Sequence, residues 1–447
     1  MKNKFKNKNV LVIGLKKSGQ SSLELLFKLN AICYAYDDDK EILKKFATQN
    51  KYNIITSLDE DIIKIMDYMV ISPSVSVNSE WVKLAKLFGV KVIGELELGS
   101  YFAKGKIISI TGSNGKTTTC SLIYHILRSA NKHCILCGNI GEPLTENLLP
   151  YKTTYCVEAS SFQLESVQKF RPDIAGILNI TPNHLDRHLT FEKYVEAKLN
   201  IFKNMSKSGL LVLNYDDKNL RKLAYDKLKP KTVFVSINEE IDGYFVKNDV
   251  IFSKKSKKIK EIANISTRKL VGEHNLCNIL FATAICKKLK IKNKDIEKAI
   301  NSFTPLKHRL QFVKNVNGVD YVNDSKSTSP DSTIKAIDSY KKPLILLLGG
   351  SDKKTSFDRL AKKIKQNKDI KLVVVSGDTS KQIIKSLSKY GFKNYYKAEN
   401  FVDGLNFATQ NALVGDTILL SPACASFDYF SSFEERGNKF VEYVESL

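Results

Sequence analysis

A short polar turn between an apolar run and an amphipathic stretch is the part of this sequence that most clearly predicts chemistry. The turn reads GSNGKT at residues 112–117, after apolar residues at 107, 108 and 110. From residue 122 onward, apolar residues recur with the spacing of one helical face. In a strand, loop and helix of this kind, the loop N–H groups and the helix N-terminus face a phosphate group. Lys116 would reach the terminal phosphates of a nucleotide, and the Thr117 hydroxyl would ligate Mg²⁺.

The turn departs from the commonest phosphate-binding loop. That loop has a glycine five residues before Gly115, where this sequence has Ile110, so the first glycine here is Gly112. The alternative is an ordinary strand-to-helix turn with a surface lysine. We prefer the phosphate loop because the flanking strand and helix are those that it requires. The residues predicted to bind the nucleotide are Gly112, Ser113, Asn114, Gly115, Lys116, Thr117 and Thr118.

Polar residues also follow two later apolar runs. Residues 155–157 predict a strand that ends at Glu158, where P-loop enzymes place a carboxylate facing Mg²⁺, although a surface carboxylate explains Glu158 equally well. A strand predicted at 177–180 is followed by TPNHLDRH, whose histidines and aspartate indicate metal or phosphate chemistry. Lys198 lies fourteen residues after His184 and by itself indicates nothing in so lysine-rich a chain.

Length and composition limit the class of protein. The 447 residues predict about three domains, and 43% hydrophobic residues suffice for a core in each. The apolar part of the N-terminal stretch is too short for a signal sequence, and no later run approaches the roughly 18 residues of a membrane span. We therefore expect a soluble cytoplasmic protein. The eight scattered cysteines favour reduced thiols, and the CxxC pair Cys134 and Cys137 is interpreted as two strand thiols.

The formal net charge of +23 has three explanations. A nucleic-acid-binding protein, an enzyme for anionic substrates and a general lysine bias would each give it. The densest basic run, Lys254–Glu261, is expected to be solvated surface after a hairpin. Aromatic residues do not interleave with lysines as a base-stacking surface requires, so we expect neither nucleic acid nor membrane as a partner.

The first hundred residues alternate predicted strands and helices. Strands are expected at 10–13, 32–36 and 68–71, with a turn at 14–19 and a helix at 21–29. The turn is not GxGxxG because Lys16 replaces the second glycine, which argues against an NAD site. A nucleotide diphosphate on the helix start at Ser18 and a purely structural turn remain equal alternatives.

The rest of the chain is also expected to be α/β. Short strands are predicted at 210–213 and 233–237, a hairpin across 247–249 and a helix from His274. Pro305 marks a boundary, after which strands are predicted at 320–322, 344–348, 372–375 and 417–420. We therefore predict an α/β protein of three domains: a Rossmann-like domain at 1–96, a central P-loop ATPase-type domain at 97–304 and a C-terminal Rossmann-like domain at 305–447.

Several motifs resemble those of the Mur ligase family of peptidoglycan synthesis, and the resemblance covers essentially the whole chain. TGSNGKTTT, HRLQ and the three-domain order are similar to the family as a whole. EASSFQLE (158–165), NDSKST (323–328) and SPACASFDYFSSFEERG (421–437) resemble its D-glutamate-adding members. The resemblance implies that ATP phosphorylates the carboxylate of UDP-N-acetylmuramoyl-L-alanine and that the amine of D-glutamate attacks the acyl phosphate. It also implies a cytoplasmic, monomeric enzyme of cell-wall synthesis whose first domain binds the UDP substrate and whose last binds the amino acid.

The same resemblance implies roles for individual residues. Lys116 contacts the ATP phosphates, Thr117 and Glu158 hold one Mg²⁺, and His184 and Lys198 serve a second. Since an ammonium of pKa about 10.4 cannot ligate a cation, the family pattern implies a carbamylated Lys198. The other matching positions are Asn275, Asn278, Arg309 and Asp324 for ATP, Lys326, Thr328, Lys353, Ser426 and Phe433 for D-glutamate, and Asn139 and Ser18 for the UDP substrate.

Two other functions remain as alternatives. One is a sister ligase of the same family, adding a different amino acid, or a folylpolyglutamate-type amide ligase. The other is a P-loop ATPase that acts on nucleic acid, which the positive charge suggests. Departures from the family pattern occur at Asn183, before the histidine, and at Lys16 and Lys17 in the first turn.

Overall fold

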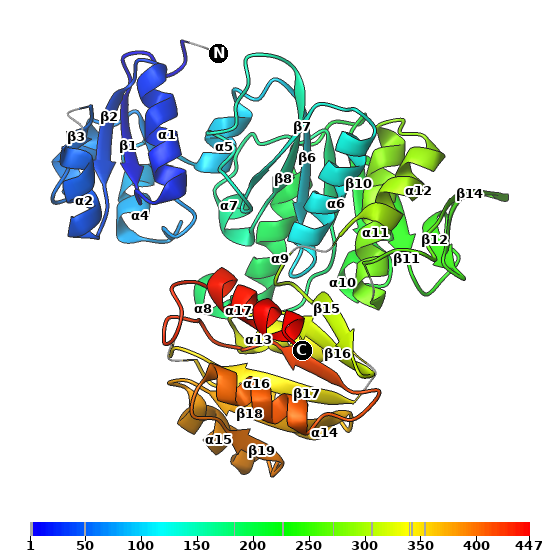
Figure 1. Cartoon of the computed structure of the whole chain (residues 1–447). Helices are drawn as coiled ribbons and strands as arrows, with labels where there is room; N and C mark the ends of the chain where they lie inside the picture. Colours follow the sequence, from blue (N-terminus) through cyan, green and yellow to red (C-terminus); the bar gives the residue numbers. More distant parts are fainter. Residues whose placement is uncertain are drawn as a thin grey trace. The chain divides into compact units, whose positions relative to one another are not determined.

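The computed structural model describes residues 3–48, 51–182, 184–225, 228–270, 272–304, 307–338, 340, 343–352 and 355–447, apart from the side chains of 185, 186, 224, 225 and 274. The chain forms two compact units, Met1–Phe303 and Thr304–Leu447. The described residues form three sheets with helices between their strands (Figure 1). The α/β class expected from the sequence is confirmed.

The first sheet consists of parallel strands in the order β3-β2-β1-β4-β5, the order of a Rossmann half. Its strands are β1 (Asn9–Ile13), β2 (Ile32–Tyr36), β3 (Asn53–Ile54), β4 (Tyr68–Ile71) and β5 (Lys91–Gly94). Its helices are α1 (Lys17–Lys28), α2 (Lys40–Ala47), α3 (Glu60–Lys64) and α4 (Glu80–Leu87).

The helix expected at 21–29 begins earlier than predicted, at Lys17. Gly14 turns the chain at a φ of +84°, and the Gln20 N–H already donates to the Lys16 carbonyl. A Cβ at Gly19 would lie 1.8 Å from the Gly14 oxygen, so only glycine lets the first helical turn pack so closely on the strand end. The predicted turn therefore ends three residues sooner, and Ser18 belongs to the helix.

The second sheet lies in the same unit and has the order β14-β13-β12-β11-β10-β9-β6-β8-β7. Its strands are β6 (Gly105–Thr111), β7 (Cys134–Gly138), β8 (Thr153–Glu158), β9 (Ile174–Ile177), β10 (Leu210–Asn214), β11 (Lys231–Ser236), β12 (Gly243–Lys247), β13 (Val250–Lys255) and β14 (Lys258–Asn264). All pair in parallel except the β12–β13 and β13–β14 pairs. Its helices are α5 (Glu95–Ser100), α6 (Lys116–Ser129), α7 (Ser161–Glu165), α8 (Leu185–His188), α9 (Phe191–Leu199), α10 (Lys218–Arg221), α11 (Glu273–Lys288) and α12 (Asn293–Ser302).

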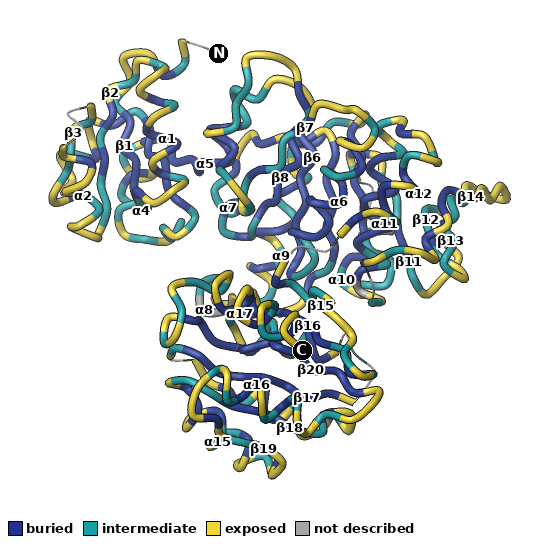
Figure 2. The backbone as a smooth tube through the Cα atoms, viewed as in Figure 1, coloured by how far each residue is buried: buried dark blue, intermediate teal, exposed yellow. Residues whose placement is uncertain are grey.

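Separate apolar cores cover the two faces of this sheet. One includes residues of α6, α11 and α12, and the other includes residues of α5, α7 and α9. Figure 2 shows the strands between them as largely buried. Cys134 belongs to the first core and Cys137 to the second, because residues three apart in a strand point to opposite faces. Both thiols are free and buried, which confirms the interpretation of the CxxC pair as two strand thiols.

The predicted hairpin across 247–249 is confirmed by the antiparallel pairing of β12 and β13. Asn248 and Asp249 have φ of +49° and +58°, as a tight hairpin turn requires. The basic run at 254–261 is exposed over most of its length and follows the turn of this hairpin, as expected; it also forms the turn of a second hairpin, β13–β14. The strand predicted at 177–180 is wrong, because β9 ends at Ile177.

The C-terminal unit contains the third sheet, in the order β15-β16-β20-β17-β18-β19. Its strands are β15 (Gln311–Val316), β16 (Val319–Asn323), β17 (Leu344–Gly349), β18 (Ile370–Ser376), β19 (Tyr395–Lys397) and β20 (Thr417–Leu420). Among the named strands of the described part of this unit, β15 pairs antiparallel with β16 and the other pairs are parallel. Its helices are α13 (Pro330–Asp338), α14 (Asp358–Gln366), α15 (Ser380–Lys389), α16 (Phe401–Gln410) and α17 (Phe433–Glu445).

The carboxyl ends of β16, β17 and β20 are the points where the polar motifs of this unit begin. Ligands of open parallel sheets bind at this edge, which makes these loops the natural site within the unit. As to membranes, every helix in the described parts of the chain is too short or too polar to cross a bilayer.

Candidate active site

The predicted phosphate loop connects α6 to β6, which lies between β9 and β8 in the second sheet. Gly115 caps the helix at a φ of +79°, which favours glycine. A Cβ at this position would also lie 2.4 Å from Oδ1 of Asn278, so a side chain here has neither the backbone conformation nor the room. The loop is therefore held against α11, and its helix begins at Lys116 as the sequence predicts.

Lys116 extends back over the loop. Its Nζ donates hydrogen bonds to the carbonyl oxygens of Gly112 at 2.8 Å and Ser113 at 3.1 Å. The loop and the cation that would bind the same phosphate are thus adjacent. The arrangement suits a polyphosphate, because the N–H groups at the start of α6 and the Lys116 ammonium both supply positive charge.

Glu158 ends β8 and is only 2% exposed, so the alternative of a surface carboxylate is wrong. The Thr117 hydroxyl donates to Oε2 at 2.8 Å, and Asn139 Nδ2 donates to Oε1 at 2.8 Å. The three predicted residues meet because β8 lies beside β6 and β7, so their carboxyl ends share one edge. A hydroxyl and a carboxylate are the oxygen ligands that Mg²⁺ prefers.

Lys198 reaches the phosphate loop from α9, 86 positions away in the sequence. It is 1% exposed, and Nζ donates to the Gly112 carbonyl at 2.9 Å. The ammonium also lies 4.7 Å from the ring centroid of Tyr194. A lysine that appeared ordinary in the sequence is therefore buried against the loop.

His184 lies at the start of α8 with a φ of +53°, and its ring centroid is 4.9 Å from that of Phe162. Phe162 belongs to α7, which directly follows the Glu158 strand. His184 thus stands beside the helix that follows Glu158 in the chain. Asn183, the departure noted before this histidine, lies outside the described residues.

Two asparagines predicted to contact ATP lie on α11 beside the loop helix. Asn278 Oδ1 accepts a hydrogen bond from the Thr119 hydroxyl at 3.1 Å. Asn278 Nδ2 in turn donates to Asn275 Oδ1 at 2.9 Å. Both side chains are buried, and these bonds fix them against α6.

The sequence did not point to Asn179 or Tyr194, which support the loop. The Asn179 carbonyl accepts from the Ser113 N–H, and its Oδ1 accepts from the Asn114 N–H, each at 2.9 Å. The Tyr194 hydroxyl is 2.8 Å from Ser113 Oγ. The sequence predicts a strand at 177–180 and so does not single out Asn179, whereas β9 ends at Ile177 and both oxygens of Asn179 accept hydrogen bonds from loop N–H groups.

Ser18 lies away from this cluster, in the first turn of α1, which begins at the carboxyl edge of the first sheet after the middle strand β1. Its carbonyl accepts hydrogen bonds from the hydroxyls of Ser21 and Ser22. The same helix contacts the segment after β7, since Ser21 Oγ is 2.7 Å from Thr145 Oγ1 and Lys17 pairs with Glu142 at 2.6 Å. This edge is where a diphosphate on the helix start would lie.

In the C-terminal unit, Asp324 follows β16 and is 2% exposed. It accepts from the Leu310 N–H at 3.2 Å and from the Ser421 hydroxyl at 2.7 Å. Burial raises the pKa of this carboxyl to about 6, against the opposing effect of these bonds and of the Arg309 charge. The bond to Leu310 places Asp324 next to the HRLQ segment that contains Arg309.

The other residues predicted for this unit lie on neighbouring loops. Lys326 Nζ lies 5.7 Å from the ring centroid of Phe433, and Ser426 is buried in the loop after β20. The Ala423 N–H donates to the Ser327 carbonyl at 3.0 Å, which joins the segment of Lys326 and Thr328 to that of Ser426. Lys353, the remaining predicted residue, lies outside the described residues.

Comparison with protein families gives two matches. Residues 110–286 match the Mur ligase middle domain, and residues 308–424 match the Mur ligase glutamate ligase domain. Between them these regions contain most of the predicted site residues.

Curated relatives match over almost the full length. A UDP-N-acetylmuramoylalanine–D-glutamate ligase of Caldicellulosiruptor saccharolyticus is 38% identical over 98% of this chain and 99% of its own. Enzymes of the same name from Lachnospira eligens and Clostridioides difficile are each 39% identical over 99% of this chain. The two alignments cover 100% of the Lachnospira eligens enzyme and 99% of the Clostridioides difficile enzyme.

Solved structures with a similar fold are more distant in sequence. A pseudomurein peptide ligase type C from Methanothermus fervidus aligns with a TM-score of 0.58 at 20% identity, covering 98% of this chain and 100% of its own. A MurF ligase from Thermotoga maritima, solved in complex with ADP, aligns with a TM-score of 0.56 at 16% identity, covering 100% and 96%. At these identities the likeness shows a shared fold.

Proposed function

The chain belongs to the Mur ligase family, and we infer that it is an ATP-dependent ligase that joins D-glutamate to UDP-N-acetylmuramoyl-L-alanine in peptidoglycan precursor synthesis. The observation that carries this function is the near-complete alignment, at 38–39% identity, with enzymes named for that reaction. The sister ligases among the solved structures share 20% identity or less. The comparison therefore favours D-glutamate addition over a sister or folylpolyglutamate-type ligase.

The chemistry requires that two anions meet. An oxygen of the alanyl carboxylate attacks the γ-phosphorus of ATP, the bond to the β-phosphate oxygen breaks, and ADP leaves. A carboxylate and a triphosphate repel each other, so the site must supply positive charge and fixed donors. Lys116 and the loop N–H groups supply them on the phosphate side, which the bonds from Lys116 to Gly112 and Ser113 support.

The amide bond forms in the second step. The neutral amine of D-glutamate attacks the acyl carbon, a proton leaves the nitrogen, and phosphate departs with the former carboxylate oxygen. The acyl phosphate must be protected from water until then, which the buried setting of Glu158 and Lys198 favours.

We propose that Mg²⁺ is held by Thr117 and Glu158. These two side chains suit Mg²⁺ because both offer oxygen ligands, and the Thr117 hydroxyl lies 2.8 Å from Oε2 of Glu158. Asn139 orients the other carboxylate oxygen, Oε1. When bound, Mg²⁺ neutralises charge that develops on the phosphates.

For a second ion, the proposed holders are His184 and Lys198. Lys198 suits an ion only as a carbamate, whose oxygens replace the ammonium. Its position against the Gly112 carbonyl supports this placement beside the nucleotide phosphates.

The remaining assignments extend this proposal. We assign ATP contacts to Asn275, Asn278, Arg309 and Asp324, D-glutamate contacts to Lys326, Thr328, Lys353, Ser426 and Phe433, and UDP-substrate contacts to Ser18 and Asn139. The three domains proposed are 1–96, 97–304 and 305–447. We further propose that the protein is a monomer. We also propose that it acts in the cytoplasm on small-molecule substrates, because ATP and UDP-linked sugars are the reactants.

An amino-acid panel tests the function. With UDP-N-acetylmuramoyl-L-alanine and ATP, we expect phosphate release with D-glutamate about a hundredfold faster than with L-glutamate, L-alanine, lysine or diaminopimelate, because a site built for two carboxylates and one configuration rejects the others. Turnover with another amino acid and none with D-glutamate would identify a sister ligase. Turnover stimulated by DNA or RNA instead of the acceptor would favour the nucleic-acid ATPase.

A further inference from the structure

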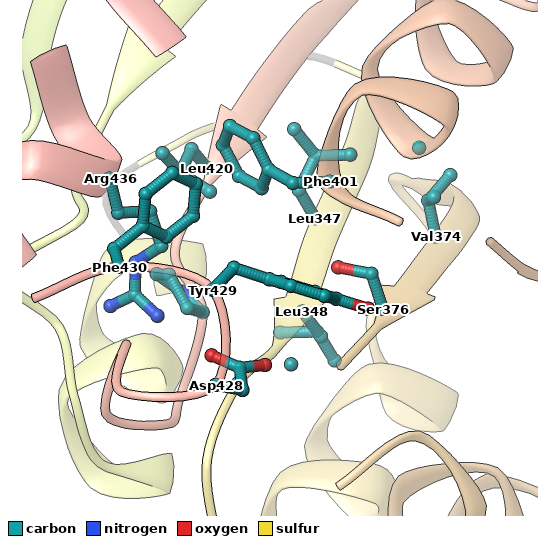
Figure 3. Close-up of a pocket in the computed structure, with 14 residues that line it drawn as sticks. Leu347, Leu348, Val374, Ser376, Phe401, Leu420, Asp428, Tyr429, Phe430 and Arg436 are labelled. Carbon is teal, nitrogen blue, oxygen red and sulfur yellow. The ribbon is translucent and has the colours of Figure 1, made fainter. Parts of the chain in front are cut away.

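Arg436 is a buried cation that the proposed mechanism does not use. It lies in the first turns of α17, is 3% exposed, and forms part of the wall of a pocket with Phe430 and Asp428 (Figure 3). Burial lowers the pKa of its guanidinium to about 10, so it keeps its charge near neutral pH. A charge this deeply buried is costly to keep unless its hydrogen bonds are specific.

The guanidinium donates to two separate loops. Nε and one terminal nitrogen reach Ser325, at its Oγ and its carbonyl oxygen, each at 2.9 Å. The terminal nitrogens also reach the carbonyl oxygens of Cys424 and Ala425, each at 3.1 Å. All four acceptors are neutral oxygens, and three belong to the backbone, so the bonds fix the paths of the two loops.

These two loops carry residues assigned to the D-glutamate site. Ser325 directly precedes Lys326, and Ala425 directly precedes Ser426. The Ser325 hydroxyl, which accepts from Arg436, also donates to the Phe433 carbonyl at 2.8 Å. One side chain therefore joins the three segments that hold Lys326, Ser426 and Phe433.

Only arginine fits this arrangement. Its planar fork has five N–H donors, and four of them are used here in two directions. Lysine has three donors on one atom and cannot reach both loops with the same geometry. The site is also tight, because a Cβ at Gly350 would lie 3.1 Å from one terminal nitrogen of Arg436 and 2.0 Å from the Ala425 oxygen.

We propose that Arg436 is a positioning residue that holds the Ser325–Lys326 and Ala425–Ser426 loops at the spacing that binds D-glutamate. The inference rests on the proposed function and adds to it a residue that does not touch the substrate. Misplacement of binding groups by about 1 Å can cost about a hundredfold in rate, so loss of the fork is sufficient to impair the site.

The test compares Arg436→Met and Arg436→Lys with a control, Arg359→Met. Arg359 lies on α14 of the same unit, where it is 74% exposed and pairs with Asp331. Methionine approximates the length and apolar packing of Arg436 and removes all of its N–H donors, whereas lysine keeps the positive charge. We expect the KM for D-glutamate to rise about tenfold or more in both Arg436 variants, with the KM for ATP and for the UDP substrate within about twofold of wild type. The Arg359 variant is expected to match wild type.

A second measurement follows the loops directly. Hydrogen–deuterium exchange of peptides covering 323–328 and 423–428 is expected to accelerate in Arg436→Met and not in Arg359→Met. Unchanged exchange would overturn the inference, and so would an unchanged KM for D-glutamate in Arg436→Lys, because charge alone would then suffice. If the wild type does not use D-glutamate at all, the proposed function fails, while the exchange result still decides whether Arg436 holds the loops.

Discussion

Replacement of Glu158 by glutamine, or of Lys116 by alanine, is expected to lower the ligation rate at least about a thousandfold. Lys116 supplies positive charge to the nucleotide phosphates, and Glu158 supplies the negative charge that holds the proposed Mg²⁺. Glutamine keeps the shape of Glu158 and an oxygen for the bond from Asn139, so the fold is expected to survive. What it removes is the negative charge that the structure places against the Thr117 hydroxyl. Phosphate release with the UDP acceptor and D-glutamate gives the rate.

Two exposed residues serve as matched controls for this prediction. Lys106 lies at the start of the same strand that leads to the phosphate loop, and Glu192 lies in the first turn of α9. Alanine at either position is expected to leave the rate within about twofold of wild type, as exposed substitutions generally do. Near-normal ligation by Glu158→Gln would remove the carboxylate from the site and with it the proposed metal ligand.

Lys198→Ala is likewise expected to be inactive and to recover part of its activity when formate or acetate is added. The reason is the proposed carbamate: truncation of a side chain that is 1% exposed leaves a space beside the Gly112 carbonyl, and a small carboxylate can return the missing oxygens there. The measurement is the ligation rate over a range of added carboxylate concentrations.

The choice of additive separates two functions of this lysine. Recovery with methylamine, and none with carboxylates, would mean that the ammonium itself is needed and would contradict the carbamate. Full activity without any additive would remove Lys198 from the site. Lys193→Ala is the control, since Lys193 is exposed on the same helix.

The phosphate loop was predictable from sequence because all its parts are contiguous. An apolar run, a glycine turn and a helical face within some twenty residues specify the local structure, and the strand ending at Glu158 follows from the same pattern. The strand at 417–420 was predicted with its exact bounds for the same reason, since it is a continuous buried run. The local pattern of apolar residues thus predicts these strands and the loops at their carboxyl ends.

Contacts between distant residues could not be predicted in this way. Lys198 meets the loop only because α9 packs beside it, and family resemblance alone singled it out. The apolar residues around Asn179 predict a strand there. In the structure its side-chain oxygen accepts a hydrogen bond from Asn114 of the phosphate loop. In the sequence, Arg436 is one residue of the long motif at 421–437. Its neighbours in the sequence do not indicate that its guanidinium joins two loops.

Activation of the alanyl carboxylate as an acyl phosphate is the central step of the proposed reaction. The direct test uses UDP-N-acetylmuramoyl-L-alanine whose terminal carboxylate oxygens are both ¹⁸O, with ATP, Mg²⁺ and D-glutamate, and measures the isotope in the released phosphate by mass spectrometry. We predict one ¹⁸O in the phosphate for each amide bond formed. Phosphate released without the label, at the same rate as the amide, would contradict the mechanism.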